Sequence, residues 1–99
     1  MSDLDELIHQ PLRLRLMTAL YAERDADPLD FARIKRITEA TDGNLGSHLT
    51  TLEKAGYISI VKDFHGKKPR TRAQITQTGQ RAYRQHVGFL RELLEQGEG

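Results

Sequence analysis

The stretch Thr41–Ile58, with the sequence TDGNLGSHLTTLEKAGYI, is typical of a capped helix that runs directly into a β-strand. Three leucines recur with helical spacing and share one side of this helix: Leu45, Leu49 and Leu52. The other side carries short polar side chains: Asn44, Ser47, His48 and Thr51. A helix that presents small hydrogen-bonding groups fits a DNA major groove, although the same pattern also suits an ordinary solvated surface.

Three further helices are predicted before Thr41. A short amphipathic helix is expected at the start of the chain, from the spacing of Leu4, Leu7 and Ile8. Pro11 suits the first turn of a second helix, which extends to about residue 23, because its missing N–H costs nothing there. Asp30 is expected to cap a third helix, with an apolar stripe made of Phe31, Ile34 and Ile37.

A β-hairpin and a long helix are predicted after Gly56, which suits the end of the preceding helix. The hairpin is expected to consist of a strand over 57–63, a turn over 64–69 and a returning strand over 70–75. Thr76 can cap the final helix over about 77–96, with an apolar stripe made of Tyr83, Val87, Leu90 and Leu94. This order predicts one domain over 1–99 that is mainly α with a small β-hairpin, an α+β winged helix-turn-helix. Its helix-turn-helix covers about 30–55 and its wing about 57–76.

Charge is divided unevenly along the chain, although the net charge is only +1. Residues 1–30 hold three basic and seven acidic side chains, whereas residues 61–84 hold seven basic side chains and the single acid Asp63. A basic segment directly after the polar helix indicates an electrostatic footprint for a polyanion. A hairpin whose charge serves only solubility is the alternative interpretation.

Several classes of function find little support in the composition. The chain has no cysteine, its serines (Ser2, Ser47 and Ser59) lie in no nucleophile motif, and no phosphate-binding or dinucleotide-binding loop is present, so no enzyme and no cofactor are predicted. The four histidines show no metal-ligand spacing, and no metal site is predicted: His9, His48, His65 and His86. No signal peptide or membrane span is apparent, and a cytoplasmic protein without membrane contact is expected.

The chain resembles the winged-helix transcriptional regulators related to the MarR and ArsR families over roughly residues 8 to 82. The resemblance rests on a set of motifs: His9–Met17, Asp30-Phe31, Thr41–Leu45 with His48-Leu49, Leu52–Ile58, Phe64–Thr71, and Ile75-Thr76 with Gly79. One position departs from the pattern, since Gly46 stands where such helices commonly have serine. A close approach between two helices would explain a glycine there, at a cost of about 1 kcal/mol in helix propensity relative to alanine.

The resemblance implies that residues 43–54 form a recognition helix for double-stranded DNA. Direct base readout is assigned to Asn44, Ser47 and His48. Contacts with the DNA backbone are assigned to Thr50, Thr51, Lys54, Lys67, Lys68, Arg70 and Arg72. The predicted function is sequence-specific regulation of transcription, and the alternative is a winged helix that binds only other proteins.

A homodimer on a palindromic operator is also expected, because the final helix is longer than the core of so small a domain needs. Its predicted interface joins the two ends of the chain: Leu4, Leu7, Ile8, Tyr83, Val87, Leu90 and Leu94. The alternative is that this apolar face packs within one monomer. An unknown small-molecule effector is left open as a further partner.

Overall fold

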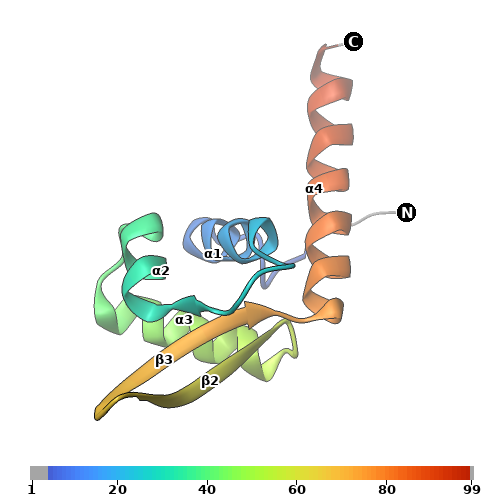
Figure 1. Ribbon diagram of the computed structural model, residues 1–99. Helices are drawn as coiled ribbons and strands as arrows, with labels where there is room; N and C mark the ends of the chain where they lie inside the picture. Colours follow the sequence, from blue (N-terminus) through green and yellow to red (C-terminus); the bar gives the residue numbers. More distant parts are fainter. Residues whose placement is uncertain (1–4, 99) are drawn as a thin grey trace.

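The computed structural model describes residues 5–98, so Leu4 lies outside the described residues. Its elements in chain order are α1 (Pro11–Ala22), β1 (Leu29–Asp30), α2 (Phe31–Thr38), α3 (Asp42–Lys54), β2 (Ile58–His65), β3 (Lys68–Ile75) and α4 (Gln77–Glu98). The strands form an antiparallel sheet in the order β1-β3-β2. In Figure 1 the hairpin extends sideways below the helices, and α4 rises away from the rest of the molecule. The fold is thus the predicted winged helix-turn-helix with a long C-terminal helix.

One hydrophobic core joins the helices to the base of the hairpin. Helix α3 contributes the three leucines that the sequence placed on one face, and all three are buried: Leu45, Leu49 and Leu52. They pack with buried residues of α1, α2 and the sheet: Leu16, Met17, Leu20, Ile34, Ile58, Ala73 and Ile75. Removing this apolar surface from water is the main force that holds α3 in place.

The ends of α3 are fixed by local interactions that the sequence anticipated. The Thr41 side chain accepts a hydrogen bond from the backbone N–H of Asn44 at 3.3 Å, as a helix cap does. At the other end Gly56 has a φ of +80°, in the left-handed region that glycine tolerates best. The chain can therefore leave α3 and enter β2 within three residues.

The expected opening helix is wrong, because residues 6–8 form a turn. The Asp5 carbonyl oxygen accepts from the N–H groups of Ile8 and His9, and the Asp5 carboxylate accepts from Leu7 N–H at 2.9 Å and from the Tyr57 hydroxyl at 2.7 Å. Ile8 is completely buried in the core of the single chain. Ile8 therefore packs inside its own chain and cannot contact a partner. Its assignment to a dimer surface is wrong.

Helix α2 matches the predicted apolar stripe only in part, because its two buried residues are Ile34 and Thr38. Ile34 is buried as expected, but Ile37 is 47% exposed and Thr38 takes the next core position. The Thr38 hydroxyl donates to the carbonyl oxygen of Ile34 at 2.8 Å, so its polar group is satisfied inside the helix. Asp30 occupies the N-cap position but its side chain makes no capping hydrogen bond.

The hairpin is longer and its turn tighter than predicted. The strands continue to the pair His65 and Lys68, leaving a two-residue turn instead of the expected six-residue turn over 64–69. Gly66 occupies the first turn position with a φ of +65°, as tight hairpins require. Strand β1 was not predicted; its residues Leu29 and Asp30 pair with Ala73 and Arg72 of β3.

Helix α4 is anchored at its first turns and free at its end. The Thr76 hydroxyl donates to the carbonyl oxygen of Gly56 at 2.6 Å and accepts from Gly79 N–H at 3.0 Å, which confirms Thr76 as a cap. Further along, Leu93 and Leu94 are 52% and 68% exposed. The last turns of α4 therefore expose apolar side chains that the described chain does not cover.

Candidate nucleic-acid interface

Helix α3 exposes a stripe of short polar side chains opposite its buried leucines. Asn44, Ser47 and Lys54 are exposed and Thr51 is half-buried, and the four recur with helical spacing. Two of the three residues assigned to base readout, Asn44 and Ser47, thus lie on the accessible face of the helix. This face offers an amide, two hydroxyls and one cation to a ligand.

The third predicted reader, His48, lies at the edge of this face. Its side chain is half-buried. Burial lowers the pKa of His48, and the nearby Arg13 guanidinium lowers it further. His48 is therefore neutral at pH 7, so it can exchange hydrogen bonds with a base edge but brings no positive charge to a phosphate.

The threonine hydroxyls of α3 are already engaged within the helix. Thr50 donates to the carbonyl oxygen of Gly46 at 3.0 Å, and Thr51 donates to that of Ser47 at 3.1 Å. A phosphate oxygen can only accept a hydrogen bond, so either hydroxyl must rotate before it can donate to DNA. In the conformation observed, both oxygens instead offer lone pairs to donors such as base amino groups.

A groove with a volume of about 1070 Å³ separates α3 from the hairpin. Its walls combine Gly46, Thr50 and Glu53 of α3 with basic residues of the wing, among them Lys62, Lys68 and Arg70. Nothing lies within 4 Å of the point where a Gly46 side chain would begin. The expected close approach between helices at Gly46 is therefore wrong: this glycine leaves open space in the groove.

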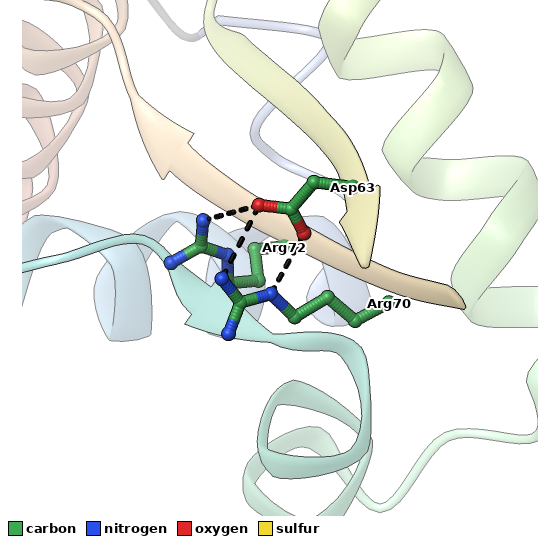
Figure 2. A network of polar contacts seen from close by, with 3 residues as sticks. All are labelled: Asp63, Arg70 and Arg72. Atoms are coloured by element: carbon green, nitrogen blue, oxygen red, sulfur yellow. Dashed lines mark hydrogen bonds and ion pairs between the residues drawn. The ribbon is translucent and has the colours of Figure 1, made fainter. Parts of the chain in front are cut away.

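An ion-pair network holds the middle of the wing. Figure 2 shows the Arg70 and Arg72 guanidinium groups meeting the single carboxylate of Asp63. The contacts are Arg70 Nε to Asp63 Oδ1 at 2.7 Å and Arg72 to Asp63 Oδ2 at 2.9 Å. The hydrogen bond from Arg70 is the main reason that the pKa of the Asp63 carboxyl lies below its ordinary value. Both arginines assigned to the DNA backbone are thus also structural members of the wing, and the triad keeps one net positive charge.

The exposed charge of the wing lies at its tip. Lys67 and Lys68 are both exposed beside the turn, and Lys62 is exposed on β2. Since Asp63 is paired with two arginines, no carboxylate of the hairpin is free to neutralise these lysines. The wing therefore presents a cationic end to solvent.

Comparison with known proteins places this arrangement in a family. Residues 12–94 match the family of winged helix DNA-binding domains. The chain belongs to this family. Among sequence relatives, an uncharacterized protein of Methanocaldococcus jannaschii is 26% identical over 88 residues, which cover 89% of this chain and 92% of that protein.

Solved structures of transcriptional regulators share this winged helix fold. The transcriptional regulator homologue of Pyrococcus horikoshii has a TM-score of 0.83 at 27% identity, covering 92% of this chain and 87% of that one. The MepR–DNA complex of Staphylococcus aureus has a TM-score of 0.73 at 18% identity, covering 95% and 77%. The chain is thus a winged helix DNA-binding domain protein that shares its fold with these transcriptional regulators, and its family is not a class of enzymes.

The residues assigned to a dimer surface on α4 divide into two groups. Tyr83 is engaged within the winged helix domain, because its ring packs on Tyr21 with centroids 4.7 Å apart and its hydroxyl lies 2.9 Å from the Thr18 hydroxyl. Val87 and Leu90 are half-buried, whereas Leu94 is mostly exposed. Only the distal part of the predicted stripe is therefore available to a second molecule.

A buried histidine, to which the sequence assigned no metal site, ties the N-terminal turn to α4. His86 is completely buried, and its Nδ1 accepts from the backbone N–H of Asp5 at 3.2 Å. Its ring meets the His9 ring edge-on, with centroids 5.7 Å apart. Burial lowers the pKa of His86, and the neighbouring His9 lowers it further, while the Asp5 carboxylate opposes both. His86 is held as a neutral acceptor.

We expect this histidine to make the domain less stable in acid. The unfolded chain takes up a proton at His86 near the ordinary pKa of 6.5, whereas the folded chain does so only at lower pH. The free energy of unfolding should therefore fall as the pH drops below about 6.5 and level off beneath the folded pKa. Urea titrations between pH 7.5 and 5 measure it. A His86→Asn variant keeps an acceptor but cannot titrate, so a pH dependence as steep as that of the parent protein would contradict this role.

Two further observations concern the described residues only. None of the helices over 5–98 is both long and apolar enough to cross a membrane. Across the same residues, no group of three histidine, aspartate or glutamate side chains is arranged to hold a metal ion.

Proposed function

We propose that this protein regulates transcription by binding specific sites in double-stranded DNA as a homodimer. In this proposal α3 lies in the major groove, and the wing lies against the neighbouring backbone and minor groove. The observation that carries it is the exposed face of α3: Asn44 and Ser47 are accessible opposite the buried leucines, on the helix that leads directly into the basic hairpin. Short polar side chains suit base edges, and lysines at the wing tip attract phosphates.

The free end of α4 supports the homodimer. Leu93 and Leu94 are exposed there, and Leu90 and Leu7 are half-buried. Pairing these apolar side chains across a two-fold axis would remove them from water. A two-fold dimer would present two α3 helices about 34 Å apart, one turn of DNA, and would require a palindromic site.

Base readout is expected to depend on Asn44 and Ser47. Replacing either with alanine should remove hydrogen bonds to a base edge and weaken discrimination at that base pair by about 1–3 kcal/mol. Competition binding with single-base variants of the selected site measures this. Gln85→Ala serves as the control, because Gln85 is an exposed amide on α4, away from the groove. Unchanged preference at every base pair in both α3 variants would remove these residues from readout.

Selection of binding sites from random duplex DNA at near-physiological salt tests the function as a whole. We expect enrichment of a palindrome with half-sites about one helical turn apart. Sedimentation at micromolar concentration should give a dimer. Binding without enrichment would overturn sequence specificity, and a monomer in sedimentation would overturn the symmetric complex.

The alternative of a winged helix that binds only proteins is tested by the same experiment. Such a module would show no binding to DNA even at low salt, where phosphate contacts are strongest. The exposed lysines of the wing tip favour DNA, since they have no carboxylate of the hairpin to pair with.

A further inference from the structure

The tip of the wing carries an apolar side chain that the fold of the monomer does not use. Phe64 is 67% exposed and lies outside the hydrophobic core. It is the last but one residue of β2 and pairs with Pro69 across the hairpin. Directly opposite residues of a hairpin share one face, so Phe64 and Pro69 form a small apolar point at the end of the wing.

The surroundings of this point are cationic. Lys67 lies in the turn beyond it and Lys68 begins β3, while Lys62 lies two residues earlier on the same face of β2. The single carboxylate of the hairpin, Asp63, is occupied by two arginines. An apolar tip flanked by lysines is complementary to a binding partner that has a narrow apolar cleft with negative charges on either side.

The hairpin is also built to keep this point in place. The turn has only two residues, and the pairs at His65–Lys68 and Phe64–Pro69 continue the ladder to the tip. Immediately behind them, Asp63 binds Arg70 from the opposite strand at 2.7 Å. Because the tip of the hairpin is already rigid, it loses little conformational entropy when it binds in a narrow groove.

We propose that Phe64, backed by Pro69, enters the minor groove of DNA and partly unstacks one base step, which bends the duplex. The stacked bases at the floor of the groove accept an apolar wedge, while the flanking phosphates attract the lysines. This inference rests on the proposed function and adds to it a residue that shapes the DNA. Pyrimidine–purine steps unstack most easily, so the wing selects such a step without hydrogen bonds to its bases.

The test uses the full chain and the palindromic duplex obtained by site selection. Dyes at the two ends of the duplex report bending by energy transfer, and 2-aminopurine placed beneath the wing reports unstacking by increased fluorescence. We expect the parent protein to give both signals. Phe64→Ala should abolish the fluorescence increase, reduce the bend and lower affinity about tenfold, the order expected for truncating one aromatic side chain. The slope of affinity against salt should not change, because no charge is removed.

Two variants serve as controls. Phe64→Leu keeps an apolar wedge and should retain the bend, whereas Ile37→Ala removes an exposed apolar side chain of α2 and should change neither signal. If Phe64→Ala bends and unstacks DNA like the parent protein, the wedge is wrong while the proposed function stands. If the parent protein binds no DNA at low salt, the proposed function itself fails. If Phe64→Ala instead abolishes self-association in sedimentation, the tip belongs to a second copy of the chain and the wedge is likewise overturned.

Discussion

Replacing Gly79 with alanine is expected to destabilise the domain by about 3 kcal/mol, the upper range for overpacking a core. A Cβ atom at this position would collide with the carbonyl oxygen of Tyr57 and would approach Ile75 Cγ1 to 2.9 Å. The Tyr57 carbonyl is held by the N–H of Thr76 at 3.0 Å, so it cannot easily move away. Thermal unfolding at fixed protein concentration should show a midpoint lower by more than about 10 °C.

A glycine-to-alanine substitution elsewhere on α4 provides a matched control, because it is expected to raise stability instead of lowering it. Gly88 lies in the interior of α4, and nothing is within 4 Å of the position its Cβ would take. Gly88→Ala should therefore raise stability by about 0.5–1 kcal/mol through helix propensity alone. Equal midpoints for the Gly79 and Gly88 variants would show that α4 does not pack against Tyr57 as described.

Neutralising the wing tip is expected to have the largest effect on DNA binding. In the double variant Lys67→Gln and Lys68→Gln, two exposed cations are removed from each protomer. Affinity should fall by an order of magnitude or more for every DNA sequence, and the slope of log affinity against log salt should become shallower by about 0.9 for each phosphate that is no longer neutralised. Titrations of labelled duplex at several salt concentrations measure both quantities.

A charge-matched control separates this local effect from a general one. Arg84→Gln with Arg91→Gln removes the same charge from α4, which rises away from α3 and the wing in Figure 1. We expect this variant to keep nearly the full salt slope. Slopes that fall equally in both double variants would mean that net charge, and not the wing tip, governs the affinity.

Local signals in the sequence were sufficient to predict α3 and its neighbours in order. The leucine spacing, the cap at Thr41 and the glycine at 56 each act within one or two helical turns. The accessible positions of Asn44 and Ser47 follow from the same spacing, because the face opposite a buried stripe must be exposed. These parts of the fold and of the candidate site could therefore be predicted.

The secondary structure predicted from the sequence is wrong where contacts with distant residues override a local pattern. Leu7 and Ile8 have helical spacing, but Asp5 binds the backbone of this segment and the Tyr57 hydroxyl, so a turn forms. Burial raises the pKa of that tyrosine to about 12, with the Asp5 carboxylate adding to the effect. No pattern within the first ten residues indicates a partner that lies some fifty positions along the chain.

The sequence by itself determined that α3 lies between other helices and a β-hairpin, and which charges gather in the wing, because these features depend on spacing and composition. Only the tertiary structure decided which of those charged side chains form ion pairs and which remain exposed. The tight turn at Gly66 sets the hairpin register, which places Asp63 opposite Arg70 and leaves Lys67 and Lys68 exposed at the tip. Tertiary packing likewise placed Gly46 on an open groove and Gly79 against the Tyr57 carbonyl. A one-residue change in register would turn each strand side chain to the other face, so these contacts follow from the packed structure and not from residue type.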